Sequence, residues 1–312
     1  MRGLFWDPRY RRLRAFWRIL LFLMARSALD SGLMGLAALL GYLQRAPVPV
    51  SIVASAVATL SSTYLCARVV DRRSFRDLGL EPTRANCVDL SLGLAVGAAL
   101  MTLILATGLA CGWLWIESTW AGYDGPLSVI RPLILWTLVG VHEEVWARGY
   151  LFVNLAEGLH GALSARGALL AAWVLTSVYF GALHTFNPAA TLRSTVALVG
   201  SGLLLGLGML LLGRLGLPIG LHIAWNLFEG TIYGLPVSGL RLSPFSVFNT
   251  IDRGPTLWTG GAFGPEGGLL GMLAMLAGMA AILLIARARR GGLSLATQLT
   301  TPPAWREVPV DH

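Results

Sequence analysis

The stretch LSLGLAVGAALMTLILATGLACGWLW, residues 90–115, decides the fold. It carries no charged side chain over more than the ~20 residues that a helix needs to cross a bilayer. Comparable apolar runs lie at about residues 16–43, 48–67, 129–155, 164–183, 195–212, 217–235 and 269–286. The alternating pattern of strands is absent from these runs, and helices satisfy their own backbone groups in lipid. We therefore expect an all-α, polytopic membrane bundle of about eight transmembrane helices.

Composition supports one membrane domain. The 312 residues are 55% hydrophobic and 13% charged, whereas soluble proteins carry about 25% charged residues. No hydrophilic block is large enough to form a separate soluble domain. We expect a single domain over residues 1–312, with its motif-bearing core at about 127–235. Short basic tails, 1–15 and 287–312, complete the chain.

The net charge of +8 is placed beside the apolar runs rather than on a separate basic surface. Arginines gather before the first run, between the second and third, and after the last, whereas the loop after the third run carries Glu117 and Asp124. This bias predicts that both termini are cytoplasmic, and it argues against nucleic-acid binding. The absence of lysine favours a prokaryotic cell membrane. Although the arginine-rich start resembles a secretory signal, apolar sequence resumes at Leu33, so we expect a retained first segment.

Three polar clusters interrupt the apolar runs. The first is VHEEVWARGY, residues 141–150, in which Glu144 and Arg148 are spaced to form an ion pair along one helix face. Glu143 points about 100° away from Glu144 and has no local cation, so it is a candidate general base. A structural ion-pair cluster that locks helix packing is the alternative interpretation.

The other two clusters are FGALH, residues 180–184, and HIAWN, residues 222–226. His222 and Asn226 share a helix face, and both can donate hydrogen bonds towards one point, as an oxyanion site requires. Each histidine taken singly is more often a satisfied core group. Three clusters on three different segments, however, predict a common polar centre, and its most economical use is chemistry.

Other kinds of site are less well supported. Trp146 stands where the zinc motif His-Glu-x-x-His needs its second histidine, although Glu143, His184 and His222 remain a possible ligand set. Serine hydrolases are disfavoured because no Gly-x-Ser-x-Gly elbow occurs. A proton-coupled transporter is a further alternative, but the chain lacks a clear internal repeat. We expect no metal and no cofactor.

Together, the motifs resemble the CAAX protease and bacteriocin-processing family, the Abi group of intramembrane glutamic endopeptidases. This family includes the type II CAAX prenyl endopeptidases. The resemblance rests on Glu-Glu-x-x-x-Arg at residues 143–148, Phe-x-x-x-His at 180–184 and His-x-x-x-Asn at 222–226. The stretch Gly-Pro-Glu-Gly-Gly, residues 264–268, also resembles bacterial members; we interpret it as a turn that places Glu266 at the start of the last helix.

The resemblance implies a role for each motif residue. Glu143 with His184 would activate a water, and His222 with Asn226 would stabilise the oxyanion. Glu144 and Arg148 would support the site, as would Phe180, and no metal would be needed. The expected substrate is a membrane-associated peptide or protein, and the expected surroundings are the lipid bilayer. A non-proteolytic partner, such as a bacteriocin-immunity or assembly factor, remains the alternative, and the oligomeric state is unknown.

The expected segments contain one conflict. They place His184 near the outer end of the fifth segment and His222 near the inner end of the seventh. With strict alternation across the membrane, the two histidines would be far apart. The segment boundaries must therefore shift, or one segment must tilt or break, before the motifs can meet.

Overall fold

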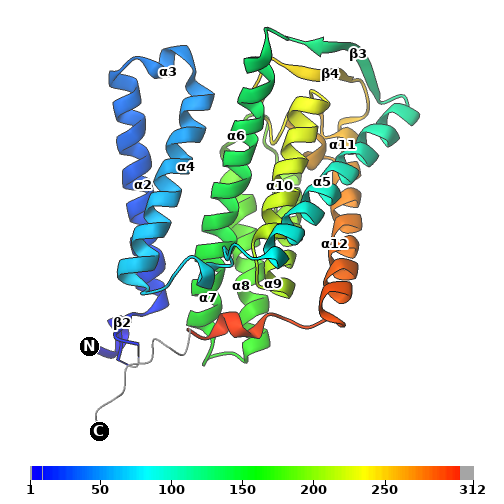
Figure 1. The fold of residues 1–312 in the computed structure, drawn as a ribbon. Helices are drawn as coiled ribbons and strands as arrows, with labels where there is room; N and C mark the ends of the chain where they lie inside the picture. The colour runs from blue at the N-terminus through cyan, green and yellow to red at the C-terminus, as the bar shows by residue number, and fades with distance from the viewer. Residues whose placement is uncertain (1, 9, 303–312) are drawn as a thin grey trace.

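The computed structural model describes residues 2–8 and 10–302 and is dominated by a bundle of long helices (Figure 1). Each expected apolar run corresponds to a helix. The helices of the bundle are α2 (Ala15–Leu39), α4 (Pro47–Leu65), α5 (Arg84–Ala110), α6 (Pro126–Glu144), α7 (Phe152–Leu159), α8 (Ala165–Leu183), α9 (Leu192–Leu212), α10 (Gly216–Leu227) and α12 (Leu269–Arg290). π-helical turns extend three of them: η1 (Cys66–Val70) after α4, η3 (Val145–Leu151) between α6 and α7, and η5 (Phe228–Ile232) after α10.

Six helices within the described residues are long and apolar enough to cross a membrane. Their ranges are Ala15–Leu39, Pro47–Val70, Arg84–Ala110, Ala165–Phe186, Leu192–Leu212 and Leu269–Arg290. The chain is therefore an integral membrane protein with an all-α bundle. Of the three helices that carry the motifs, α8 belongs to this set of six, whereas α6 and α10 do not. α10 is almost fully buried, but α6 exposes several large apolar side chains.

Local sequence explains where several helices begin. Thr83 accepts a hydrogen bond from the Asn86 N–H at the start of α5, and Ser164 does the same for Gly167 at the start of α8. Thr191 and Ser194 form a reciprocal capping box at the start of α9. The last helix, α12, carries three arginines in its final turn. Their positive charges are favourable beside the negative C-terminal end of the helix dipole.

Small residues bring α10 unusually close to α5. A Cβ atom on Gly93 would lie 2.2 Å from the Leu217 carbonyl oxygen, and one on Gly220 would lie 2.1 Å from the Leu90 carbonyl oxygen. Neither position tolerates a side chain without moving the backbone. The pairing therefore depends on glycine from both helices, as is common for helices that pack in membranes. It fixes the depth of α10, which carries His222.

Two small antiparallel sheets lie outside the helical bundle. β1 (Trp6–Asp7) pairs with β2 (Arg12–Leu13), and β3 (Leu114–Ala121) pairs with β4 (Ser246–Asp252). The register of the second pair runs from Leu114 opposite Asp252 to Ala121 opposite Ser246. β3 was hidden because its first residues complete the apolar run of α5. The chain leaves the helix at Cys111 and continues as an extended ribbon.

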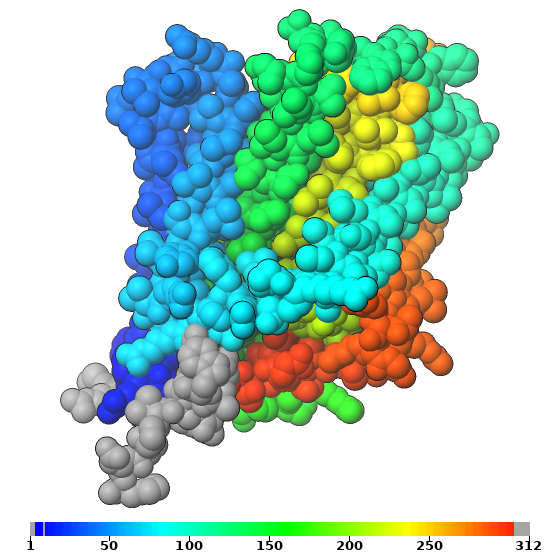
Figure 2. Space-filling view, in the orientation of Figure 1, coloured from blue at the N-terminus to red at the C-terminus, as the bar shows by residue number. Residues whose placement is uncertain are grey.

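The chain segments near the two ends of the described chain lie at the same end of the bundle, opposite the β3–β4 sheet (Figure 1). The space-filling view shows α5 crossing one face obliquely, beside the segments of this end (Figure 2). A buried group of charges holds these segments together, and we call it the basic-end cluster. Its members are Arg12, Arg18, Asp71, Arg73 and Glu157.

Glu157 is the centre of the basic-end cluster. Its Oε1 accepts hydrogen bonds from Arg12 and Arg18, and its Oε2 accepts one from Arg73. The cluster thereby joins the N-terminal segment, the loop after η1 and α7. Burial alone would raise the pKa of Glu157, but the three arginine charges outweigh it and hold the pKa below its ordinary value.

Candidate active site

The first cluster lies at the junction of α6 and η3. Glu144 and Arg148 form the ion pair that their spacing predicts, with Arg148 Nη1 2.7 Å from Glu144 Oε1 and both side chains fully buried. Arg148 also donates to the Gly202 carbonyl of α9 at 3.2 Å. The wider turn of the π-helix begins just after Glu144, a type of irregularity that is frequent at functional sites.

Glu143 differs from its neighbour. Its side chain is 22% exposed, and its carboxylate accepts no hydrogen bond from any described residue. The nearest basic group is the His222 ring, with Nε2 3.9 Å from Glu143 Oε2. This distance is too long for a hydrogen bond, so Glu143 keeps both oxygens available.

The His222 ring lies between the two glutamates. Its Nδ1 is 2.8 Å from Glu144 Oε1, the same oxygen that Arg148 contacts. Because a carboxylate oxygen accepts hydrogen bonds, we assign a proton to Nδ1. In the neutral ring, Nε2 then carries no proton and offers a lone pair. It becomes a hydrogen-bond donor only when the ring is an imidazolium.

His184 follows the end of α8 and begins the 3₁₀ turn η4 (His184–Phe186). Its Nδ1 lies 2.8 Å from the Phe180 carbonyl oxygen, so Nδ1 carries a proton and the Nε2 lone pair remains free in the neutral ring. The Phe180 ring packs against three site groups: its centroid is 4.4 Å from the Arg148 guanidinium, 4.7 Å from the His184 ring and 6.2 Å from the His222 ring.

Asn226 lies one turn beyond His222 on α10, and its side chain is 96% buried by the rest of the protein (4% exposed). Its amide has no hydrogen-bond partner among the described residues, although it lines a cavity. The i,i+4 spacing therefore places His222 and Asn226 on the same wall, as predicted from the sequence.

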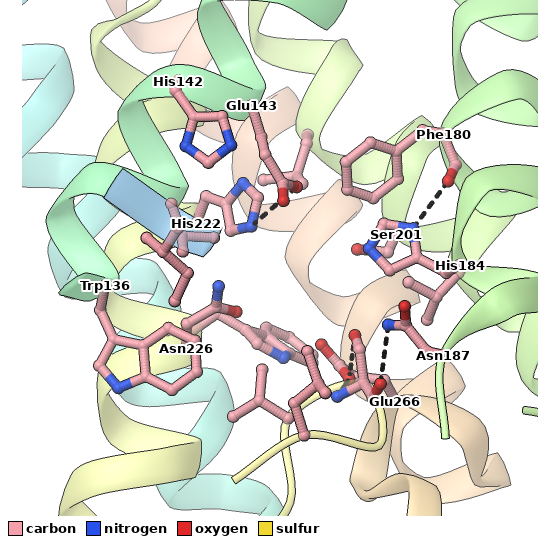
Figure 3. Close-up of a pocket in the computed structure, with 18 of the residues that line it drawn as sticks. Trp136, His142, Glu143, Phe180, His184, Asn187, Ser201, His222, Asn226 and Glu266 are labelled. Atoms are coloured by element: carbon pink, nitrogen blue, oxygen red, sulfur yellow. Dashed lines mark hydrogen bonds and ion pairs between the residues drawn. The ribbon is translucent and has the colours of Figure 1, made fainter. Parts of the chain in front are cut away.

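A cavity of about 200 Å³ joins these side chains (Figure 3). Glu143, Phe180, His184, His222 and Asn226 all line it. Glu144 and Arg148 are not among the lining residues and lie behind His222 and Phe180. The structure thus brings all seven predicted residues together, five at the cavity wall and two directly behind it.

The apparent conflict in depth between the two histidines is resolved by the bundle. His184 and His222 line the same cavity, and the Phe180 ring contacts both. α10 continues into η5 as far as Ile232, so His222 lies well inside this continuous helix rather than at its inner end. His184 is the first residue beyond α8 and faces inward from that helix end.

Sequence reasoning missed several cavity residues. Ser51 and Ser55 of α4, Trp136 of α6, Asn187 and Ser238 of two loops, and Glu266 also line the cavity. Most of these positions show no signal in a single sequence, because polar residues in loops are common. Glu266 did carry a signal, since its glycine-rich surroundings were recognisable. It was assigned to a helix start instead of to the cavity.

The possible two-histidine, one-carboxylate metal site is not assembled here. Within residues 2–8 and 10–302, no group of three His, Cys, Asp or Glu side chains is arranged to hold one ion. The site is therefore a set of carboxylate, imidazole and amide groups around a cavity. Such a set can move protons and donate hydrogen bonds to a developing charge.

Comparison with known families agrees with this arrangement. Residues 125–228 match the family model described as "Type II CAAX prenyl endopeptidase Rce1-like". This segment, about a third of the chain, is similar to the CAAX protease family. The matched segment contains all seven predicted site residues. Comparisons with curated proteins and with solved structures found no match.

Proposed function

We propose that this CAAX-type intramembrane protease is a metal-independent glutamic endopeptidase whose water is activated by Glu143 and His184. The observation that carries the proposal is the position of Glu143. Its carboxylate is in the cavity with both oxygens unbonded, beside a pocket wall that supplies His184, whose Nε2 lone pair is free. An activating base needs this combination of access and partial desolvation.

The reaction follows from these groups. A water between Glu143 and His184 loses a proton to one of them while its oxygen bonds to the peptide carbonyl carbon. The carbonyl electrons move to oxygen and form a tetrahedral oxyanion. Collapse of this intermediate breaks the C–N bond, and the departing nitrogen takes the proton that the base has held. Atoms and charge balance without a metal or other cofactor.

His222 and Asn226 are proposed to stabilise the oxyanion. The Asn226 amide is free to donate because no described residue occupies it. His222 donates from Nε2 when it is an imidazolium, and it lies between Glu143 and Glu144. Glu144 and Arg148 hold the ring in place through the bond from Nδ1, and Phe180 packs against the pair.

The substrate is proposed to be a membrane-associated peptide or protein segment that enters from the lipid bilayer. Residues 127–235 form the catalytic core of a single domain under this proposal. The gathering of arginines at the end where the first and last described segments lie supports a cytoplasmic location for that end in a prokaryotic cell membrane.

The proposal is tested with purified protein in liposomes and a library of membrane-anchored peptides. Wild type, Glu143→Gln and a matched control, Glu117→Gln on the exposed surface of β3, are each assayed with and without a chelator. Cleavage by wild type and the control but not by Glu143→Gln, unchanged by the chelator, is the expected result. Loss of cleavage on chelation would move the chemistry to a metal. If folded wild type cleaves nothing, the chain is better explained as a non-proteolytic partner.

A further inference from the structure

One carboxylate of the cavity lies outside the matched segment 125–228. Glu266 belongs to the 3₁₀ turn η7 (Pro265–Gly267), just before α12. Its side chain is 4% exposed, and it lines the same cavity as Glu143 and His184. Figure 3 shows it across the cavity from Glu143 and His222. The expected position at a helix start is thus correct in the chain, but the carboxylate faces the cavity instead of capping the helix.

The glycines around Glu266 press its loop against neighbouring backbone. Gly264 has φ +103°, and a Cβ there would lie 2.1 Å from the Pro236 carbonyl oxygen. A Cβ on Gly268 would lie 2.3 Å from the Trp258 carbonyl oxygen. Neither position has room for a side chain. The close backbone contacts of these two glycines hold the loop in the position from which Glu266 reaches the cavity.

The loop is also held by side chains. Arg193 of α9 donates from Nε to the Gly267 carbonyl oxygen at 2.9 Å. Ser238 binds Glu266 Oε2 twice, from its backbone N–H at 2.6 Å and from its hydroxyl at 2.7 Å. Asn187 in turn donates to the Ser238 carbonyl oxygen at 2.9 Å. The carboxylate is consequently fixed by one oxygen only.

The other oxygen of Glu266, Oε1, has no hydrogen-bond partner in the described part of the chain. It is open to the cavity that Glu266 lines. An oxygen that is open to a polar cavity accepts a hydrogen bond from the water or the ligand that fills the cavity. Glu266 therefore presents an acceptor to whatever occupies the cavity.

A second buried acid lies behind the loop. Glu229 of η5 is fully buried, and neither of its oxygens has a hydrogen-bond partner among the residues described. It lies against the loop, because a Cβ on Gly264 would be 3.0 Å from Glu229 Oε1. No arginine forms an ion pair with Glu229 or Glu266 within residues 2–8 and 10–302. Neither acid therefore has an arginine as its counter-ion within these residues.

We propose that Glu266 is a cation subsite of the active-site cavity and binds a basic side chain of the peptide substrate; this rests on the proposed function. A guanidinium or ammonium group would satisfy Oε1 and offset the acidic charge, whereas a backbone N–H would satisfy only the hydrogen bond. A cavity of about 200 Å³ is large enough for one long side chain. The subsite selects substrates by charge and takes no part in water activation.

The direct test measures binding, so it does not depend on turnover. Fluorescent, lipid-anchored peptides that carry one arginine, scanned through eight positions, are titrated against Glu143→Gln protein in nanodiscs. Matched peptides replace arginine by citrulline, which has the same shape without the charge. We expect at least one position at which the arginine peptide binds tenfold or more tightly. Equal binding of the two sets at every position, or no binding of either, would overturn the proposal.

A second arm assigns the selectivity to the carboxylate. In Glu143→Gln/Glu266→Gln protein, the preference for arginine should fall to less than twofold, while binding of the citrulline peptides stays the same. The control Glu143→Gln/Glu117→Gln should retain the preference. An equal loss for both peptides would indicate a purely structural role for Glu266. Cleavage by Glu143→Gln itself would refute the proposed function without changing the outcome of this binding comparison.

Discussion

The basic-end cluster and the active-site cluster both contain buried acidic and basic side chains, but they differ in how many carboxylate oxygens accept hydrogen bonds. In the basic-end cluster, all four carboxylate oxygens of Asp71 and Glu157 accept hydrogen bonds, Asp71 from Tyr150 and Asn154 and Glu157 from three arginines. In the active-site cluster, Glu144 accepts two bonds at one oxygen, and Glu143 accepts none from the described residues.

This difference separates structure from chemistry. Carboxylates whose oxygens all accept hydrogen bonds hold segments of the chain together. Water or substrate could bind to them only by displacing one of these hydrogen bonds. Incomplete carboxylates beside a cavity leave positions for water and substrate. Buried ionisable groups are expensive in either case, so a cluster left incomplete is best explained by function.

The largest effect, on both cleavage and stability, is expected from Arg148→Met, which removes the arginine of the active-site cluster. Glu144 would be left buried without its cation, at a cost of about 3–5 kcal/mol in the free energy of unfolding. Both cleavage and the denaturation midpoint in detergent should fall. The double variant Arg148→Met/Glu144→Gln removes the stranded charge, so its midpoint should recover while cleavage remains low. A midpoint unchanged in the single variant would show that the pair contributes little.

Asn226→Ala sharpens the comparison by removing a free donor instead of a paired charge. One oxyanion donor is worth about 10²–10³-fold in kcat, and the fold should be preserved because the amide has no partner to lose. Steady-state cleavage and thermal unfolding measure the two effects separately. Asn249→Ala on β4 is the matched control and should cleave normally. Loss of less than threefold in kcat would remove Asn226 from the oxyanion site.

His184→Gln is expected to have a somewhat smaller effect. The variant loses the Nε2 lone pair that faces the cavity, which should lower kcat about 10²-fold, a typical contribution of acid–base catalysis. The free energy of unfolding should change by less than about 1 kcal/mol, because the single bond from Nδ1 to the Phe180 carbonyl is its main tie. His160→Gln in the exposed loop after α7 serves as the control. Normal turnover by His184→Gln would contradict a role in water activation.

The smallest effect is expected when the pH is lowered, and it acts on the stability that the basic-end cluster provides. Because the pKa of Glu157 is lower in the folded protein than its ordinary value of 4.5, this residue stabilises the fold above that pH. The contribution is lost as the pH falls below 4.5 through the folded pKa. Unfolding midpoints from pH 7 to pH 3 should therefore fall more steeply in wild type than in Glu157→Gln. Parallel curves would show that Glu157 is not held by its arginines.

Much of this organisation was predictable from the sequence. Apolar runs of membrane length predicted the helices, and the spacing of Glu144 and Arg148, and of His222 and Asn226, predicted shared faces. These signals are local and repeat with the helix period. That the motifs would meet was inferred from the cost of leaving them unpaired in lipid.

The remaining features depend on contacts between distant segments. Arg12 and Glu157 are 145 residues apart, so no periodicity could link them. The bond between His222 and Glu144 spans 78 residues, and it determines which ring nitrogen faces the cavity. The position of Glu266 depends on close backbone contacts of its glycines, and a single sequence does not distinguish those from an ordinary turn.

The most direct test of the account compares the same substitution in the two clusters. Glu143→Gln and Glu157→Gln are reconstituted in parallel, and both kcat and the unfolding midpoint are measured for each. The account predicts that Glu143→Gln lowers kcat by about 10²–10⁴-fold with an unchanged midpoint. It predicts that Glu157→Gln lowers the midpoint, because three buried arginines lose their carboxylate, with an unchanged kcat per folded molecule. Full cleavage by Glu143→Gln, or loss of catalysis confined to Glu157→Gln, would contradict it.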